Sequence, residues 1–159
     1  MTRKFLVSDP EKCTGCRICE IVCSAVKEKV FNPSFSRIRT VFTWPDQNVA
    51  LACRLCEDPS CVRACPRNAL RANRVTGVVE VESAKCDGCR WCMEACKFGA
   101  MLIHSRDKTV KICDLCEGAP KCVEFCPTEA LELRTAEDFS QRTRRRAIST
   151  LITGADEKL

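Results

Sequence analysis

Cysteine spacing is the feature of this sequence with the clearest chemical meaning. Sixteen of the 159 residues are cysteine, and they form four groups of four with none left over. Two groups have the spacing C-x2-C-x2-C-x3-C, and the other two have a longer step before the third cysteine. Along the chain the groups are Cys13, Cys16, Cys19, Cys23; Cys53, Cys56, Cys61, Cys65; Cys86, Cys89, Cys92, Cys96; and Cys113, Cys116, Cys122, Cys126. Clustered thiols at such short spacing indicate metal ligation.

The spacing favours [4Fe–4S] clusters over zinc or disulfides. A C-x2-C-x2-C loop presents three thiolates to one face of a cubane, and the fourth cysteine of such a run ligates the other cluster of a pair. A structural zinc site normally uses two C-x2-C pairs and needs no third cysteine two residues later. The radical-enzyme order C-x3-C-x2-C does not occur. The sequence therefore predicts four [4Fe–4S] clusters on sixteen cysteine ligands.

The formal charge of +5 does not indicate a nucleic-acid partner. Each oxidised cluster with four thiolates carries about −2, so four clusters bring the loaded chain to about −3. The surplus of Lys and Arg is then better suited to offsetting cluster charge and to docking. The basic run Arg142–Arg146 has no interleaved aromatic residues. It favours an acidic subunit surface over a nucleic acid, or it is simply solvated.

The first residues predict the compartment. The segment 1–10 has early positive charges but no apolar run long enough for a signal peptide, and no stretch approaches the ~20 apolar residues of a membrane span. We expect no direct membrane insertion and a reducing, cytoplasmic location. This location also argues against disulfides.

Two halves of the chain repeat one pattern. Lys12–Arg17 resembles Lys85–Arg90, and Cys53–Glu57 resembles Cys113–Glu117. Both groups with the longer step end in Cys-Pro-x-x-Ala-Leu. The offset is 73 residues at one pair of groups and 60 at the other, so the first half carries a 13-residue insertion after Cys23. A duplicated two-cluster unit accounts for this pattern.

Short strands and turns separate the cysteine groups, which predicts an α+β fold. We expect three hairpins, with strands at 37–44 and 48–52, at 70–75 and 78–81, and at 101–104 and 109–112. The last cysteine of each group is expected to open or to lie in a short helix, as at 94–98 and 123–130. The segment 147–152 is expected to form a short docking helix.

With these motifs the chain resembles the four-cluster ferredoxin-type subunits of the family that includes the dimethyl sulfoxide reductase iron–sulfur subunit. Formate dehydrogenases and formate-linked hydrogenases have subunits of the same family. The resemblance covers residues 5 to about 133. The segment Asn32–Ile38 and the small size are similar to the short subunits of tungsten enzymes of the aldehyde:ferredoxin oxidoreductase type. Tungsten-type benzoyl-CoA reductases also have such a subunit.

The resemblance implies two interleaved bacterial-ferredoxin-like modules within 1–133. The inner module is about 50–100, the outer module is about 5–26 plus 105–133, an inserted hairpin is about 32–50, and a basic tail is 134–159. It also implies how the cysteines share clusters. The implied ligand sets are Cys13, Cys16, Cys19 with Cys126; Cys113, Cys116, Cys122 with Cys23; Cys53, Cys56, Cys61 with Cys96; and Cys86, Cys89, Cys92 with Cys65. The repeat alone also allows the first group to pair with the second.

Four other residues carry expectations of their own. Trp91 stands beside an intact Cys92, so we expect a cubane there and not the three-iron cluster of some relatives. Lys97 either raises the potential of a nearby cluster or is a solvated lysine. His104, the only histidine, is expected on the surface of a hairpin and not as a ligand. Trp44 and Trp91 are expected to pack, and the alternatives are that they shield a cluster from water or face a partner.

No nucleophile, acid–base pair or nucleotide loop is evident, so the sequence predicts a non-catalytic electron-transfer subunit. It would pass single electrons between a larger catalytic oxidoreductase subunit with tungsten or molybdenum and another redox partner, such as a flavin subunit or a ferredoxin. The alternatives are a free polyferredoxin and the electron-transfer subunit of a hydrogenase or formate dehydrogenase complex. A zinc-based interaction module remains a third class, and self-association is compatible with the sequence.

Overall fold

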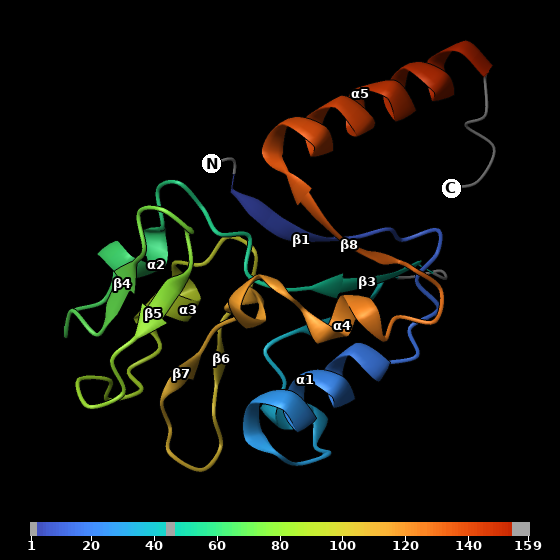
Figure 1. Ribbon diagram of the computed structural model, residues 1–159. Coiled ribbons are helices and arrows are strands. Elements are labelled where there is room, and N and C mark those ends of the chain that lie inside the picture. Colours follow the sequence, from blue (N-terminus) through green and yellow to red (C-terminus); the bar gives the residue numbers. More distant parts are fainter. Residues whose placement is uncertain (1–2, 44–46, 154–159) are drawn as a thin grey trace.

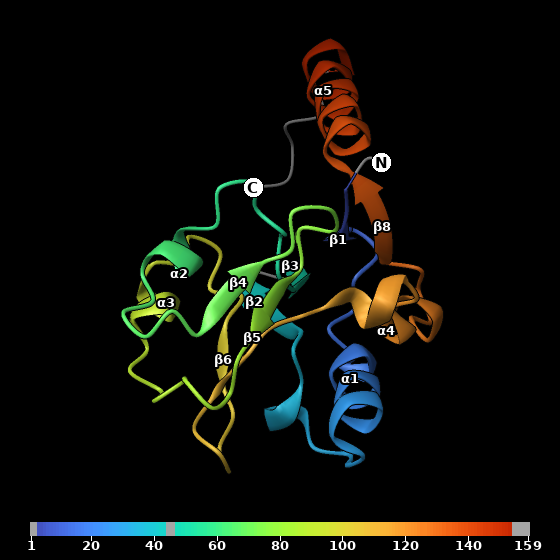
Figure 2. The same cartoon turned by 60° about the vertical axis from the view of Figure 1, so that its left-hand side comes forward.

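The structure is a computed structural model that describes residues 3–43 and 47–153. Trp44 and the turn at Pro45 and Asp46 lie outside these ranges. The fold is α+β, as predicted, and the strands within the described ranges form four separate two-stranded antiparallel sheets. Helices α2 and α3 lie on one side of the molecule, and α1 and α4 lie on the other (Figure 1, Figure 2). No helix within the described ranges is long and apolar enough to cross a membrane.

All three predicted hairpins are present. Strand β2 (Arg39–Thr43) pairs with β3 (Gln47–Leu51), β4 (Leu70–Ala72) with β5 (Val79–Val81), and β6 (Leu102–Ile103) with β7 (Val110–Lys111). Each is local in sequence, so the alternation of apolar residues and the turn chemistry between them suffice to specify it.

The fourth sheet joins the two ends of the cysteine-rich region. Strand β1 (Lys4–Ser8) pairs antiparallel with β8 (Leu131–Thr135), with Leu6 opposite Leu133. Leu6 and Leu131 are almost completely buried. This long-range pairing lay outside the sequence prediction. It brings the first and fourth cysteine groups to the same side of the fold.

The short helices differ from the prediction. Helices α2 (Ser60–Arg63), α3 (Trp91–Glu94) and α4 (Lys121–Glu124) contain the third cysteine of their groups and end before the last. The expected helices at 94–98 and 123–130 are therefore wrong. Pro66 and Pro127 explain two of the three cases, because a residue that precedes proline is disfavoured in the helical region. Only α1 (Ile18–Glu28) continues through the last cysteine of its group.

The repeat is visible in the backbone. Arg17 and Arg90 occupy equivalent positions in the two halves, and both have left-handed backbone angles, with φ of 60° and 71°. Each directly precedes a helix, α1 or α3. The 3-10 helices η1 (Pro33–Phe35) and η2 (Leu115–Gly118) lie in the insertion and in the fourth cysteine group.

In the part of the chain that the structure describes, two small apolar clusters make up the core, and cysteines belong to both. The first contains Leu6, Ile38, Leu55 and Leu131 with buried cysteines of the first and fourth groups. The second contains Leu70, Val79, Met101, Val110 and Ile112 with Cys92. Cys53 packs against both clusters. The interior is thus built around thiols, as a sequence with no tyrosine and few other aromatic residues requires.

The C-terminal helix is longer than expected. Helix α5 spans Ala136–Thr153, whereas the sequence predicted only 147–152. The residues at its start form a helix N-cap that the sequence prediction did not use. The Thr135 hydroxyl accepts the N–H of Asp138 at 3.1 Å, and Glu137 and Asp138 lie in the first turn. The helix leaves the body at the end of β8 and projects from it in both ribbon views (Figure 1, Figure 2).

The base of α5 is anchored by rings and charges. Phe139 packs edge-on against Phe5 at 5.8 Å between ring centroids, and the Arg54 guanidinium lies over both rings at 5.2 and 4.9 Å. Arg142 forms ion pairs with Asp9 at 3.0 Å and Glu132 at 3.3 Å. These contacts fix the first two turns of α5 to the β1–β8 ribbon.

Candidate metal centres

Three cavities are each lined by four cysteines. In each cavity three cysteines come from one sequence group and the fourth comes from another. The three sets are Cys53, Cys56, Cys61, Cys96; Cys65, Cys86, Cys89, Cys92; and Cys23, Cys113, Cys116, Cys122. The short helices explain the third member of each set, because each helix turns the cysteine near its start toward the loop that carries the first two.

The remaining four cysteines lie where the first and last groups meet. Helix α1, which carries Cys19, packs against α4, which ends two residues before Cys126. The N–H of Cys13 donates to Asp9 O at 3.0 Å, and the N–H of Asp9 donates to Ala130 O at 2.8 Å. The loop that carries Cys13 is thereby tied to the segment that follows Cys126.

The chemistry of these thiols fits a cationic metal core. Burial is the main cause that raises the pKa of Cys19, Cys53 and Cys92 to about 11 and that of Cys113 to about 12. A buried thiol of this kind stays protonated at neutral pH unless a positive charge stabilises the thiolate. Iron supplies that charge when it binds, so the donor sets suit iron–sulfur clusters and not free reactive thiols.

Backbone amides provide a second form of stabilisation. The N–H of Arg37 donates to Cys23 Sγ at 3.2 Å, and the N–H of Ala69 donates to Cys65 Sγ at 3.3 Å. At Cys126 burial works against ionisation, but the N–H groups of Ala130 and Leu131 and the Thr128 side chain outweigh it and lower the thiol pKa. Hydrogen bonds to ligand sulfurs are one of the means by which a protein sets cluster potential.

Within the described ranges, no three His, Cys, Asp or Glu side chains converge on a point that would hold a single metal ion. This is compatible with the cysteine-lined cavities, because the four ligands of a cubane surround an eight-atom core and bind different iron atoms.

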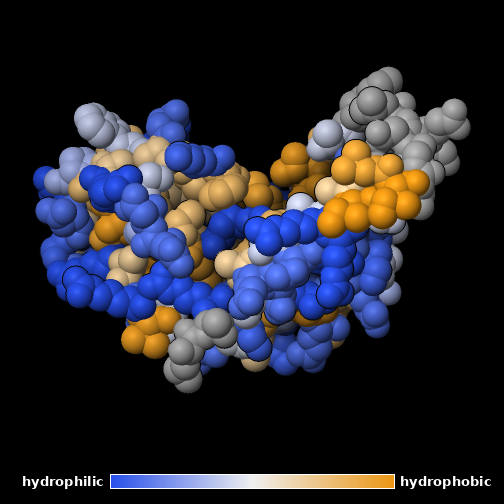
Figure 3. Space-filling model, turned by 90° about the horizontal axis from the view of Figure 1, so that it is seen from above, coloured by the Kyte–Doolittle hydropathy of each residue, from blue (hydrophilic) through white to orange (hydrophobic). Residues whose placement is uncertain are grey.

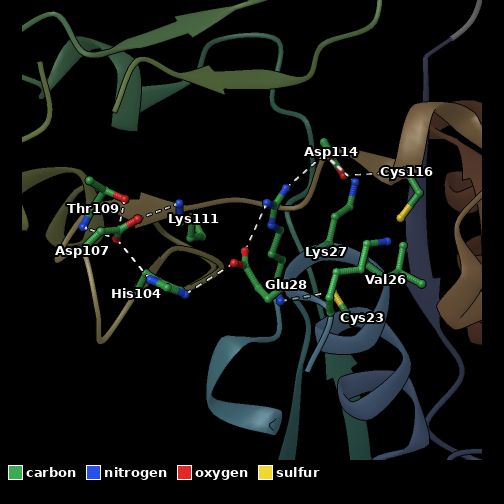
Figure 4. A network of polar contacts seen from close by, with 12 residues as sticks. Cys23, Val26, Lys27, Glu28, His104, Asp107, Thr109, Lys111, Asp114 and Cys116 are labelled. Atoms are coloured by element: carbon green, nitrogen blue, oxygen red, sulfur yellow. Dashed lines mark hydrogen bonds and ion pairs between the residues drawn. The ribbon is translucent and has the colours of Figure 1, made fainter. Parts of the chain in front are cut away.

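Charged side chains line the cavity of the Cys23 set, among them Lys27 and Asp114, whose contact is drawn in Figure 4. Asp114 lies between Cys113 and Cys116 in the chain. Its Oδ2 is 2.8 Å from Lys27 Nζ and 3.0 Å from Arg37 Nη1. Burial opposes the ionisation of Asp114, but the bonds from Lys27 and from the Cys116 N–H hold the pKa of this carboxyl below its usual value. The sequence reasoning missed Lys27 and Arg37, since α1 and the insertion reach Asp114 only in the folded chain.

Two smaller expectations are wrong. Trp91 was expected to pack, but 63% of its surface is exposed. His104 was expected on the surface, but only 6% is exposed, and its ring stacks against Phe35 at 4.6 Å between centroids. The inserted segment carries Phe35 and covers His104, so this burial is a tertiary effect. Lys97 is exposed and lines the cavity of the Cys53 set, and its influence on potential stays a prediction.

Glycines shape the ligand loops. Gly15 and Gly88 follow the first cysteine of equivalent groups, with φ of +72° and +71°. A Cβ on Gly88 would lie 2.5 Å from the carbonyl oxygen of Lys108. On Gly15 it would meet the side chain of Asn48 at 2.7 Å. Both positions therefore require glycine for its conformation and for space.

Such a fold with such cysteine sets defines a polyferredoxin, a protein whose chemistry is electron transfer between clusters. A family model described as a 4Fe-4S dicluster domain matches residues 46–136. The chain is 44% identical over 124 residues to the polyferredoxin-like subunit of aliphatic sulfonate oxidoreductase from Pyrococcus furiosus, covering 78% of this chain and 72% of that one.

A second relative is a subunit of the anaerobic dimethyl sulfoxide reductase of Escherichia coli, 33% identical over 153 residues, with 84% of this chain and 74% of that subunit covered. A solved structure of the active-site complex BamBC of benzoyl-coenzyme A reductase has a polypeptide with TM-score 0.50, 24% identity and 99% coverage of both proteins, which supports the fold. The chain belongs to the 4Fe–4S dicluster, ferredoxin-like electron-transfer subunits of the dimethyl sulfoxide reductase family. It is a non-catalytic, polyferredoxin-like subunit of oxidoreductase complexes, and its sixteen cysteines fit four [4Fe–4S] clusters.

Proposed function

We propose that this chain relays single electrons along four [4Fe–4S] clusters between a catalytic subunit of the tungsten or molybdenum type and a second redox partner. The observation that carries the proposal is the set of three cavities, each lined by four cysteines drawn from two sequence groups. The similarity to the polyferredoxin-like subunit of aliphatic sulfonate oxidoreductase supports an oxidoreductase subunit as the catalytic partner. The many thiolates suit a reducing cytoplasm.

The proposed ligand sets follow the same cavities. Cys53, Cys56 and Cys61 share a cluster with Cys96, and Cys86, Cys89 and Cys92 share one with Cys65. In the outer module Cys113, Cys116 and Cys122 share a cluster with Cys23, which leaves Cys13, Cys16 and Cys19 with Cys126. The tie from Asp9 to Ala130 supports the last set.

Contacts between the sets favour one order for the relay. Cys53 packs against both apolar clusters, so the sets of Cys53 and Cys113 meet at the boundary between the proposed modules. Negative charge at Cys53 adds to the burial that raises the pKa of Cys113. The order is then the Cys13 set, the Cys113 set, the Cys53 set and the Cys86 set.

The ends of this order have exposed features suited to electron exchange. Cys16 belongs to one terminal set and Cys89 to the other, and both are exposed. Phe125 beside Cys126 is 56% exposed, and Trp91 beside Cys92 is 63% exposed. One partner docks at each of these ends.

Helix α5 is the proposed docking arm for the catalytic subunit. Ile148, Leu151 and Ile152 are 54%, 81% and 77% exposed. Apolar side chains also gather on the α5 side of the surface in Figure 3. Arg144 and Arg145 are exposed along the same helix. An apolar groove with acidic residues at its rim complements this arm.

Substitution of the cysteines that are proposed to be shared between groups tests the assignment of ligands to clusters. Replacing Cys23 by serine should alter the EPR signal and potential of one cluster, because the fourth group loses its outside ligand. Cys65→Ser is the matched change, and it should alter the cluster of the third group. The groups are told apart by combining Cys23→Ser with Cys16→Ser or Cys116→Ser, and Cys65→Ser with Cys56→Ser or Cys89→Ser. If Cys23→Ser alters only the cluster that Cys16→Ser also alters, the proposed sharing is wrong.

The function is tested by anaerobic purification. The relay predicts about 16 iron and 16 sulfide per chain, a larger oxidoreductase subunit that copurifies, and cluster reduction when that subunit turns over its substrate. A brown protein that stays alone and reduces added acceptors would indicate a free polyferredoxin. A colourless zinc protein would reject both.

A further inference from the structure

The only histidine of the sequence is buried between two carboxylates (Figure 4). His104 Nδ1 lies 3.2 Å from Asp107 Oδ1, and Nε2 lies 3.6 Å from Glu28 Oε2. Glu28 comes from α1, and His104 and Asp107 lie between β6 and β7. Backbone bonds between His104 and Thr109 at 2.9 Å and between Lys108 and His104 at 3.0 Å fix the turn that holds the ring.

Each of the two carboxylates can accept a hydrogen bond from one ring nitrogen, and only a doubly protonated imidazole can donate both. Asp107 accepts the N–H and the hydroxyl of Thr109 and pairs with Lys111 at 3.1 Å, which together outweigh the cost of burial and hold the pKa of its carboxyl below the usual value. In a neutral ring the proton therefore stays on Nδ1, and this N–H donates a hydrogen bond to Asp107. A neutral ring then has none left on Nε2, which is buried and has no hydrogen-bond partner within the described ranges.

A short chain of contacts leads from this nitrogen to a proposed cluster ligand. Glu28 Oε1 lies 3.6 Å from Arg37 Nη2, and the Arg37 N–H donates to Cys23 Sγ at 3.2 Å. The nearby cations Lys27, Arg37 and Lys111 are balanced by Glu28, Asp107 and Asp114. Histidine alone among these residue types ordinarily changes charge between pH 5 and 8, so the state of His104 sets the net charge of the group.

We propose that His104 is a redox-linked proton site that takes up a proton at Nε2 when the cluster of the Cys23 set is reduced. The inference rests on the proposed ligand set. The electron, supplied by the redox partner, adds one negative charge to the cluster. One proton from water binds Nε2 and stays there, and the new N–H donates a hydrogen bond to the Glu28 carboxylate. The imidazolium offsets the added charge. On oxidation the electron passes back to the redox partner and the proton is released to water.

The surroundings of the ring provide a path for the proton. Glu28 faces Nε2, and its side chain is 20% exposed, so it connects this nitrogen to solvent. One face of the ring stacks on Phe35, and the Arg106 guanidinium lies 4.8 Å from the centroid of the same Phe35 ring. The charged groups that face the imidazole directly are Asp107 from the turn and Glu28 from α1.

The test is the pH dependence of cluster potentials in the loaded chain, by EPR-monitored titration from pH 5.5 to 9. In the native protein one cluster should become harder to reduce as pH rises, with a ~3–10-fold loss in its reduction equilibrium constant over this range. His104→Gln should remove this slope and retain four reducible clusters. Glu28→Gln should weaken it, and Glu80→Gln at an exposed carboxylate on β5 should leave it unchanged.

Two further measurements keep the outcomes distinct. Electrochemical reduction with a pH indicator should show proton uptake in the native chain and less in His104→Gln. Iron and sulfide counts establish that each variant contains its four clusters. If His104→Gln does not assemble them, the pH dependence of the potential in the native protein and in Glu28→Gln tests the proposal. Potentials independent of pH in the native protein, or a slope retained in His104→Gln, overturn the proposal. Absence of any reducible cluster would instead refute the proposed function.

Discussion

At the scale of single residues, backbone conformation constrains the ligand loops as much as the cysteines do. Gly88 lies between Cys86 and Cys89 in a left-handed conformation, and the carbonyl of Lys108 approaches it closely. Because that contact is to backbone, a side chain there cannot be accommodated by a rotamer change. The loop that carries two ligands and the β6–β7 turn are therefore fixed against each other.

Gly88→Ala should destabilise the loaded protein, because it adds positive-φ strain and displaces the turn at Lys108. We expect a thermal midpoint lower by about 5–10 °C at a fixed scan rate. Gly99→Ala is the matched control: Gly99 also has positive φ, at +59°, but nothing lies within 4 Å of its added Cβ. Equal losses in the two variants would show that strain alone matters and that the contact with Lys108 does not.

At the scale of elements, α5 combines an anchored base with an exposed end. Phe139 and Arg142 hold its first two turns to β1 and β8, and its last turns present apolar side chains to solvent. An exposed apolar patch of this kind marks an interaction surface more often than a stability element.

Leu151→Asp should therefore weaken copurification with the catalytic subunit by about tenfold in affinity and leave the melting temperature of the isolated chain unchanged, since Leu151 is 81% exposed. Pull-down and calorimetry measure the two effects. Val75→Asp, at a residue 65% exposed in the β4–β5 hairpin, is the matched control. Binding that survives Leu151→Asp would exclude α5 as the docking arm. Self-association that disappears in the same variant would assign the patch to a second copy.

At the scale of the whole molecule, clusters take the place of a conventional core. Cys19, Cys23, Cys113 and Cys122 lie in the first apolar cluster and Cys92 in the second, and each of the four sheets has only two strands. Isolated two-stranded sheets are marginal in water, so metal ligation must supply much of the folding free energy.

Removal of the clusters with an oxidant and a chelator should consequently unfold most of the chain. Far-UV circular dichroism should show loss of the native signal in parallel with loss of absorbance near 400 nm, and reconstitution with iron and sulfide under reducing conditions should restore both. The α5 helix has no cysteine and is the element best able to keep residual helicity. An apoprotein with a native spectrum would show that the apolar clusters suffice by themselves.

The fold was predictable wherever the determining contacts were local. The three hairpins follow from apolar alternation and turn residues, and the four cysteine groups follow from spacing. The helix expected at 123–130 was misplaced because the effect of Pro127 on the preceding cysteine was not taken into account, and Pro66 acts in the same way after Cys65. Helix α5 was underestimated because the capping role of Thr135 was overlooked.

The sequence by itself determined the number of ligands, their grouping and the class of cofactor, because thiol type and spacing are local properties of the chain. A local pattern does not show which cysteine of one group completes the ligand set of another group. That depends on loops brought together by the β1–β8 pairing and by the packing of α1 against α4. Only the tertiary structure placed Lys27 and Arg37 at Asp114 and buried His104 between Glu28 and Asp107. Electrostatic contacts of this kind join residues far apart in sequence, and no local pattern encodes them.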